Sequence, residues 1–132
     1  MNATNPAIAL VLFAHGSSRP EWRAPLDSLR TWTQEEVAAH VQVHLAFLER
    51  TRPTLLEVVA GAVAAGAAAI EILPMFISGG GHVERDLPPL MAALQAAHPG
   101  LPVKLHPAIG EHPAIVTAIA GLVGNNETPS AS

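Results

Sequence analysis

The stretch EILPMFISGGGHVERDLPPLM, residues 71–91, carries most of the information about the fold. It starts as an apolar run typical of a buried strand, passes through three consecutive glycines at positions 79–81, reaches His82 and continues into a segment with helical character. A second stretch, IALVLFAHGSSRPEW at residues 8–22, also runs from an apolar strand directly into a histidine, His15. Because both histidines follow predicted strands, we expect one structural explanation for the two.

Four apolar runs rich in strand-forming residues recur along the chain, and a segment with helical features follows each of them. The predicted strands are Ile8–Ala14, Val41–Leu48, Ala69–Ile77 and Val103–Pro107. The predicted helices cover 18–39, 51–65, 86–97 and 113–123. This βαβαβαβα order predicts an α/β fold in which a four-stranded parallel sheet has helices on both faces. The continuous apolar run IALVLFA agrees, because strands of such sheets are buried on both sides.

Two helix starts have local signals. Ser18, with Pro20 in the first turn and Glu21 three residues on, predicts a capping box at the start of the first helix. The second helix is expected to begin near Thr51, with Pro53 in its first turn.

Length and composition are those of a small single-domain protein. The chain has 132 residues, of which 49% are apolar, so we expect one domain over residues 1–123 and a disordered tail over 124–132. The absence of cysteine excludes a disulfide framework and a thiolate metal site. The net charge of −4 argues against a general nucleic-acid binder. The first apolar run is too short to span a bilayer and has no basic leader, so we expect a soluble, cytoplasmic protein without membrane contact.

The predicted sheet places three metal-binding side chains at one edge. Ligands of such sheets bind at the carboxyl ends of the strands, where the strand order reverses. For the order 2-1-3-4 this point lies between the first and third strands, which lead to His15 and His82, and Glu49 ends the neighbouring second strand. Imidazole and carboxylate groups bind divalent metals and transfer protons. Each also has a structural interpretation, because the histidines could cap helices or loops and Glu49 could pair with Arg50 or Arg52.

The glycine run and the basic residues indicate what kind of ligand would bind there. The glycine spacing fits neither the dinucleotide fingerprint nor the P-loop, and no lysine follows it. Glycines do allow the backbone to approach a large flat ligand closely. Basic residues near this edge favour a polycarboxylate, although ordinary loop solvation explains them as well. They are five of the seven Lys and Arg residues, namely Arg19, Arg23, Arg50, Arg52 and Arg85.

The remaining histidines give weaker signals. His44 in the middle of a strand and His98 at a helix end are interpreted as structural, and His40 as solvated. His106 and His112 flank the end of the fourth strand and could line the same cleft as His15 and His82. Helix capping explains His112 nearly as well.

Four motifs together resemble a known family, the small CbiX-type sirohydrochlorin chelatases of the class II chelatase superfamily. They are FAHGS (13–17), AFLERTRPTLLE (46–57), LPMFISGGGHVERDLP (73–88) and HPAIGEHPAI (106–115). The resemblance extends over Ile8–Val123 and implies a single-lobe chelatase-like fold. It also implies a metal chelatase, a lyase that inserts a divalent metal into sirohydrochlorin, an octacarboxylate tetrapyrrole. Co²⁺ would lead to cobalamin, and Fe²⁺ or Ni²⁺ to siroheme or coenzyme F430.

The same resemblance implies roles for individual residues. His15 and His82 would bind the metal, and Glu49 would assist catalysis. Substrate contacts are expected at Ser17, Arg19, Arg50, Ser78, Gly79, Gly80, Gly81 and Arg85. No organic cofactor is implied, because the divalent metal is itself a substrate. Short family members act as homodimers with the cleft between subunits, and a C2 homodimer is therefore expected here.

The sequence departs from the family pattern at one place, and two alternative functions are also considered. Relatives commonly read His-Gly-(Ser/Ala)-Arg-Asp-Pro, whereas this chain reads HGSSRP, so Ser18 and Arg19 replace Arg and Asp and substrate affinity or orientation could differ. The main alternative function is a carrier that holds a divalent metal without inserting it. A flavodoxin-like or receiver-type signalling domain fits the fold, but the sequence lacks the acidic cluster and phosphate-binding loop expected of it.

Overall fold

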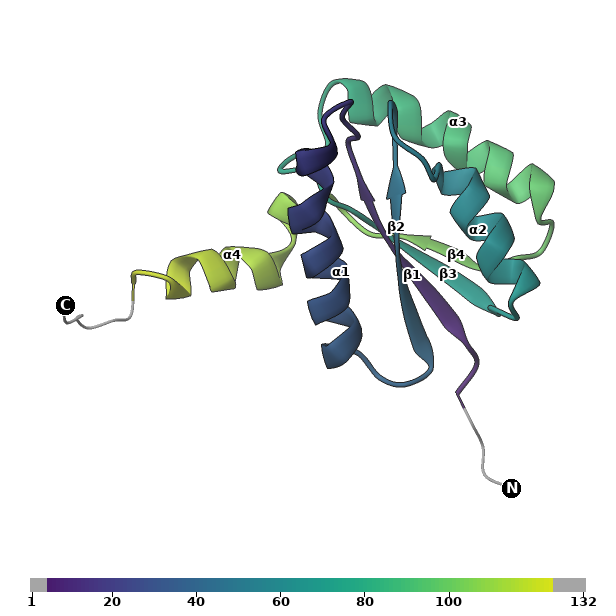
Figure 1. The fold of residues 1–132 in the computed structure, drawn as a ribbon, viewed down its shortest axis with the longest axis horizontal. Helices are drawn as coiled ribbons and strands as arrows, with labels where there is room; N and C mark the ends of the chain where they lie inside the picture. The colour runs from purple at the N-terminus through teal and green to yellow at the C-terminus, as the bar shows by residue number, and fades with distance from the viewer. Residues whose placement is uncertain (1–4, 125–132) are drawn as a thin grey trace.

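The structure, a computed structural model, describes residues 5–124 apart from the side chains of His82 and Val83. It contains a four-stranded parallel sheet in the order β2-β1-β3-β4 (Figure 1). The strands are β1 (Ile8–Ala14), β2 (Val41–Phe47), β3 (Ala69–Pro74) and β4 (Val103–Leu105). The helices are α1 (Arg23–Glu36), α2 (Leu55–Ala64), α3 (His82–Ala97) and α4 (Pro113–Gly121), with short 3₁₀ helices η1 (Pro20–Trp22) and η2 (Ile109–Glu111). The predicted α/β fold and strand order are confirmed, whereas most of the predicted tail lies outside the described residues.

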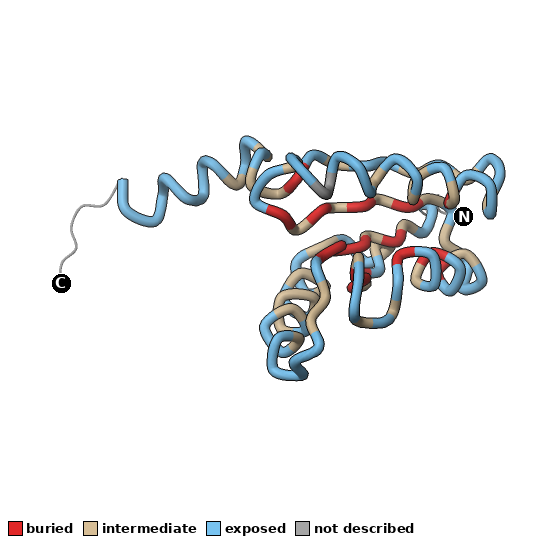
Figure 2. The backbone as a smooth tube through the Cα atoms, turned by 90° about the horizontal axis from the view of Figure 1, so that it is seen from above, coloured by how far each residue is buried: buried red, intermediate tan, exposed pale blue. Residues whose placement is uncertain are grey.

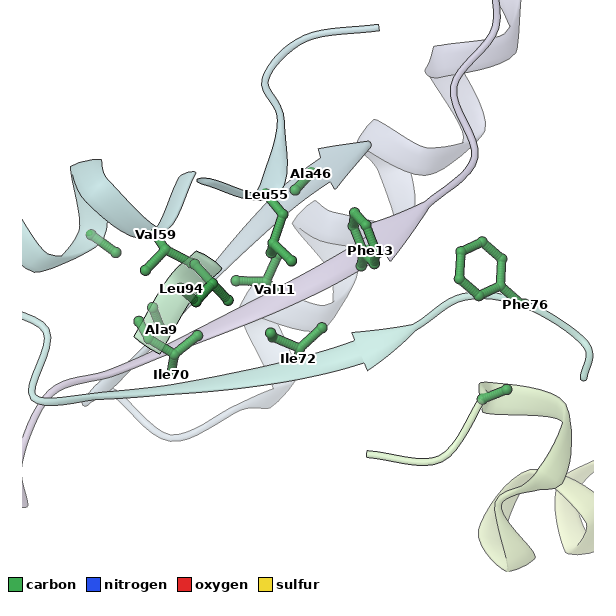
Figure 3. Close-up of a cluster of buried hydrophobic side chains, with 12 residues drawn as sticks. Ala9, Val11, Phe13, Ala46, Leu55, Val59, Ile70, Ile72, Phe76 and Leu94 are labelled. Atoms are coloured by element: carbon green, nitrogen blue, oxygen red, sulfur yellow. The ribbon is translucent and has the colours of Figure 1, made fainter. Parts of the chain in front are cut away.

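Helices pack on both faces of the sheet, as predicted. On one face, buried side chains of β1 and β2 such as Leu12 and Leu45 pack against Leu26 and Leu29 of α1. The opposite face packs against α2 and α3. Its core consists of Ala9, Val11, Phe13, Ala46, Leu55, Val59, Ala62, Ile70, Ile72, Phe76, Leu94 and Ala108, most of which Figure 3 labels. Burial of β1 on both faces explains its continuous apolar sequence.

The fourth helix departs from this layered arrangement. Helix α4 extends away from the sheet rather than lying on it (Figure 1). Every residue from Val116 to Gly124 is exposed, and Figure 2 shows the helix as a pale blue extension of the molecule. The strand-helix alternation therefore predicted that α4 exists but did not show that it would leave the domain. None of the described helices is long and apolar enough to cross a membrane.

Several predicted element ends are wrong. The expected capping box at Ser18 and Glu21 is absent, because η1 starts after Arg19 without a side-chain cap. The capping box instead occurs at α2, where Thr54 and Glu57 satisfy each other's backbone amides, and α2 starts at Leu55 rather than near position 51. Helix α3 starts at 82 rather than 86, because the positive φ of 68° at Gly81 turns the chain directly into the helix.

Strand β3 ends at Pro74, three residues before the predicted end, and the chain then forms the loop over 75–81. Phe76 of this loop turns back toward the core and packs edge-on against Phe13 with ring centroids 6.1 Å apart (Figure 3). The short strand thus leaves a long connection to α3 at the carboxyl edge of the sheet. This edge is where the candidate site lies.

Candidate functional site

His15 is the central side chain of the candidate site and follows β1 directly. Its Nδ1 atom lies 3.2 and 3.4 Å from the two carboxylate oxygens of Glu49, which follows β2. When Nδ1 carries the ring proton, it donates to Glu49 and leaves the lone pair of Nε2 available. A carboxylate partner of this kind fixes the orientation and the tautomer of a metal-binding imidazole. The predicted proximity of His15 and Glu49 is therefore confirmed, and both side chains are partly open to solvent, at 49% and 42% exposure.

The loops after β1 and β2 are locked together beside this pair. The backbone amide of Ser17 donates to the Thr51 hydroxyl at 2.9 Å, and that hydroxyl donates back to the Ser17 carbonyl at 2.9 Å. Gly16 is required at this contact, because a Cβ there would overlap the carbonyl oxygen of Glu49. The two residues of the His15–Glu49 pair are thus held by a fixed backbone. Sequence reasoning missed Thr51, since nothing local marks a contact across 34 positions.

Two aromatic side chains also hold His15 in place. The Phe76 ring lies 4.6 Å from the His15 ring, centroid to centroid, and Phe76 itself is buried. Trp22 of η1 donates from its indole nitrogen to the His15 carbonyl at 3.2 Å. His15 is therefore supported by residues from η1 and the loop after β3. Neither aromatic was predicted to be part of the site, although Trp22 belongs to the conspicuous PEW segment.

His15 lines two open hollows. One has a volume of about 570 Å³ and is lined by His15, Leu48, Glu49, Arg50, Asp86, Pro89 and Leu90. A second, of about 490 Å³, is lined by His15, Trp22, Leu26 and parts of the loop after β3, including Ser78 and Gly80. Each is within the size range of small-molecule sites. A third hollow shares Trp22 and Leu26 with the second and includes Ser17 and Arg19.

The predicted substrate-binding residues divide between this surface and other roles. The hollows around His15 include Ser17, Arg19, Arg50, Ser78 and Gly80 among their lining residues. The hydroxyl of Ser17 also accepts a hydrogen bond from the Arg19 amide at 3.1 Å. Sequence reasoning missed Asp86, Pro89 and Leu90, which reach the first hollow from α3.

In the glycine run, one residue forms a hydrogen bond to another part of the chain, and the other two have free space around them. The Gly79 amide donates to the Glu111 carboxylate of η2 at 2.9 Å. A Cβ at Gly80 or Gly81 would meet no other atom within 4 Å. The chain therefore has space at these two positions, as expected where a bulky ligand approaches. Glu111, 32 positions away in sequence, is another contact that the sequence did not reveal.

His82 is placed by its backbone alone. It is the first residue of α3 and follows Gly81, so it belongs to the carboxyl edge of the sheet as predicted. Its side chain lies outside the described part of the structure. The pairing of His15 with His82 at one metal remains a prediction. The described side chains contain no group of three or more His, Asp and Glu residues arranged to hold a metal ion.

The basic residues at this edge have two different kinds of surroundings. Arg23 lies 5.1 Å from the Phe47 ring centroid and donates to the Arg52 carbonyl at 3.0 Å, and Arg52 pairs with Glu57. The hydrogen bond from Arg52 lowers the pKa of the Glu57 carboxyl. Since Glu57 belongs to the capping box of α2, Arg52 is engaged at the start of that helix. By contrast, Arg50 has a positive φ of 70° and lines the first hollow.

The structure also shows the surroundings of three further residues that were predicted to belong to the site. The Arg19 guanidinium lies 3.9 Å from Glu21 and is largely exposed. Arg85 lies in the first turn of α3 with an exposed side chain. The structural alternative for Glu49 was an ion pair with Arg50 or Arg52; the structure instead places Glu49 beside His15 and pairs Arg52 with Glu57.

His106 and His112 do not line the hollows around His15. They belong to a different hollow beside β3, where His106 Nε2 lies 2.8 Å from a Glu71 carboxylate oxygen. The Nδ1 atom of His112 accepts the Ala114 amide at 3.2 Å and caps α4. The expectation that these histidines share the cleft of His15 is therefore wrong, and the capping interpretation of His112 is confirmed.

Comparisons with known proteins agree with the fold. The model of the CbiX family matches residues 9–125. The chain is 32% identical to the sirohydrochlorin cobaltochelatase of Methanopyrus kandleri over 84 residues, which cover 64% of this chain and 58% of that protein. It is also 32% identical to the sirohydrochlorin cobaltochelatase of Methanocaldococcus jannaschii over 90 residues, or 68% of this chain and 62% of that protein. The chain therefore matches less than two thirds of the length of these curated relatives.

Solved structures show the same architecture. A CbiX protein from Marinobacter aquaeolei VT8, provisionally assigned to cobalamin (vitamin B12) biosynthesis, has a TM-score of 0.74 and 29% identity, covering 88% of this chain and 93% of its own. The sirohydrochlorin chelatase SirB of Bacillus subtilis subspecies spizizenii, solved in complex with cobalt, has a TM-score of 0.74 and 23% identity, covering 87% of this chain and 49% of SirB. The likeness to SirB concerns the fold alone, and this chain corresponds to about half of it.

Proposed function

The chain belongs to the CbiX family, and from this premise we propose that it is a chelatase that inserts a divalent metal into sirohydrochlorin. Co²⁺ is the metal we favour, because the curated relatives that match are named cobaltochelatases. Fe²⁺ and Ni²⁺ are the other candidates. The observation that carries the proposal is the His15–Glu49 pair at the carboxyl edge of the sheet, where both residues line one open hollow and His15 also lines a second.

The proposed chemistry uses this pair twice. Metallation exchanges two pyrrole N–H protons for one divalent metal ion, so the protein must present the metal and remove protons. With Nδ1 donating to Glu49, the Nε2 atom of His15 is the atom that would hold the incoming metal, and His82 is proposed as its second ligand. Once the metal has moved to the macrocycle, the freed imidazoles of His15 and His82 can each accept one of the two pyrrole protons. Glu49 would stabilise the resulting imidazolium.

The surroundings of the pair suit a wide, carboxylate-rich disc. The hollows adjoin one another through shared lining residues, and the open glycines leave space for a flat ligand. Arg50 and Arg19 are proposed to bind substrate carboxylates, because guanidinium groups form charge-assisted hydrogen bonds with them. The protein would then hold the substrate by the carboxylates at the rim of the disc and leave the pyrrole nitrogens free to receive the metal.

We further propose that the active form is a homodimer. The hollows at the carboxyl edge are open to solvent, and an exposed disc would leave the metal in water rather than in the drier environment that strengthens electrostatic control. A second copy related by a two-fold axis would cover the substrate with the same surface. Sedimentation at micromolar concentration should then give about twice the chain mass of 13.7 kDa.

The proposal is tested by mixing sirohydrochlorin with Co²⁺, with and without the protein, and following the absorbance change of metallation. A chelatase accelerates this change at catalytic protein concentrations. The alternative, a metal carrier, would bind Co²⁺ in equilibrium dialysis but would not accelerate the change. Acceleration by the wild type with equal acceleration by His15→Ala would exclude the proposed site while leaving the activity in place.

A further inference from the structure

Trp22 is a large aromatic side chain that stays half exposed beside the candidate site. It ends η1 and is 47% exposed, although it lines the second hollow together with the apolar side chains of Leu26 and Met75. Tryptophan buries more apolar area than most side chains when it is covered, and aromatic rings contact one another preferentially in offset stacks or edge to face. The exposed part of the indole is therefore surface that a flat apolar ligand can cover.

The indole is held in a fixed position relative to the proposed metal-binding histidine. Its Nε1 atom donates to the His15 carbonyl at 3.2 Å, and the His15 ring contacts Phe76, which lies beyond Phe13 in Figure 3. Because this hydrogen bond satisfies the polar end of the indole within the protein, the apolar ring face remains for a ligand. A disc that rests on Trp22 would thus lie at a defined distance from the His15 imidazole.

The two hollows that Trp22 lines differ in their chemistry. Among the described residues that line the second hollow, only His15 is ionisable, and Ile77 at its border is 83% exposed. The third hollow, of about 360 Å³, contains the charged side chains of Arg19 and Glu21. The Arg19 side chain is 79% exposed and 3.9 Å from Glu21, so its guanidinium has donors available for a ligand carboxylate. Together the hollows suit a ligand with an apolar centre and a charged rim.

We propose that Trp22 is the side chain on which the tetrapyrrole stacks, an inference that rests on the proposed function. One face of the macrocycle lies on the exposed indole in the second hollow, and carboxylates of its rim reach Arg19 in the third. Trp22 and Leu26 line both hollows, so a disc that occupies the two passes over these residues. Of the two, Trp22 alone offers a flat aromatic face. The stack sets the height of the pyrrole nitrogens above His15.

The first test uses the two tryptophans of the chain as probe and control. Trp32 lies on α1, is 62% exposed and is ten residues from Trp22, or about 15 Å along a helix. Metal-free sirohydrochlorin is added to the ¹⁵N-labelled wild type, and the two indole N–H signals are assigned with Trp22→Phe and Trp32→Phe. The ring current of a conjugated macrocycle decays steeply with distance, so the Trp22 signal should shift strongly while the Trp32 signal stays in place.

The outcomes of this titration separate the stack from the chelatase proposal. Saturable binding of sirohydrochlorin, seen in its absorbance, without a shift of the Trp22 indole signal would overturn the stack and leave the proposed reaction in place. Equal shifts of both indole signals would overturn it too, because they would reflect a general change rather than a ligand on Trp22. Absence of both binding and accelerated metallation would overturn the stack together with the proposed function.

A second test compares variants by the dissociation constant of metal-free sirohydrochlorin. We expect Trp22→Leu to weaken binding about 10-fold, the upper range for loss of an aromatic contact, and Trp22→Phe, which keeps a flat ring but lacks the N–H, to weaken it roughly threefold. The matched control Trp32→Leu should bind like the wild type. Equal weakening by Trp22→Phe and Trp22→Leu would assign the effect to the hydrogen bond with His15. A changed sedimentation mass of Trp22→Leu would assign it to a contact between subunits, and either result would overturn the proposal.

Discussion

The loops that follow β1 and β3 both lead from a buried strand to a histidine, yet they are built in opposite ways. After β1, His15 comes at once, and the next residue, Gly16, is packed so closely against the Glu49 carbonyl that only glycine fits. After β3, seven residues intervene before His82, and Gly80 and Gly81 have open space around them. Within the glycine run, the Gly79 amide donates a hydrogen bond to the Glu111 carboxylate.

The difference separates two requirements of the proposed reaction. A metal-binding imidazole has to be oriented, and the first loop provides this through Glu49, Trp22 and the reciprocal Ser17–Thr51 hydrogen bonds. A wide macrocycle has to enter and leave, and the second loop provides space. The first loop thus fixes the orientation of the imidazole, and the second leaves space for the macrocycle. In the sequence, both look like similar junctions from a strand to a histidine.

The largest expected effect comes from removing either histidine. We expect His15→Ala and His82→Ala each to lower the rate of Co²⁺ insertion by more than about 100-fold, because loss of a metal ligand exceeds the 10- to 100-fold effect of losing a second-shell partner. His15 is half exposed, so its variant should keep the wild-type melting temperature. Near-normal turnover of either variant at limiting metal would contradict the assigned roles.

The two loops should respond differently to the same substitution. Gly16→Ala forces a methyl group into the Glu49 carbonyl and should cost about 2 kcal/mol or more of unfolding free energy, as overpacking does. Gly80→Ala meets no atom and should change stability by less than about 0.5 kcal/mol. If ligand occupies that space, Gly80→Ala should nevertheless raise KM for sirohydrochlorin. Urea denaturation and steady-state kinetics of both variants measure these quantities, and equal destabilisation would abolish the distinction between the loops.

The contrast between the loops also explains how much of the molecule the sequence could predict. Alternation of strand-like and helix-like segments predicted the parallel α/β sheet, and the continuous apolar run predicted all of β1, because burial on both faces leaves a local signal. The rule that ligands bind at the carboxyl ends of parallel strands placed Glu49 next to His15. The supports of the site, Thr51 and Glu111, were missed because they act across 34 and 32 positions and have no local signature. The course of α4 was missed because helical periodicity does not specify which surface covers a helix.

A smaller loss is expected at the carboxylate behind His15. Glu49→Gln keeps an oxygen that can accept from Nδ1 but removes the negative charge that would stabilise an imidazolium. We expect a loss of about 10-fold in turnover, the lower end of the range for second-shell partners. A fall in melting temperature without a fall in activity would show that Glu49 has only a structural role.

The hydrogen bond that holds the second loop gives a still smaller effect. Glu111→Ala removes the acceptor for the Gly79 amide, and an exposed hydrogen bond of this kind contributes about 1 kcal/mol, so metallation should slow by a few-fold. Glu111→Gln retains an acceptor oxygen and should restore most of the rate. If alanine and glutamine behave identically in Co²⁺ affinity and turnover, the hydrogen bond does not position the loop.

The smallest effect concerns a half-buried histidine, His44, in contrast to the more exposed His15. His44 lies in the middle of β2, and burial, followed by the charge of Arg30, lowers its pKa below the ordinary value of 6.5. As the pH falls through 6.5, the unfolded chain takes up a proton that the folded chain refuses, so the free energy of unfolding decreases until the folded pKa is reached. His44→Gln removes this site, and its stability should fall less than that of the wild type between pH 7 and pH 5. Urea denaturation at the two pH values measures the difference. An identical fall in the stability of both proteins would show that His44 does not contribute.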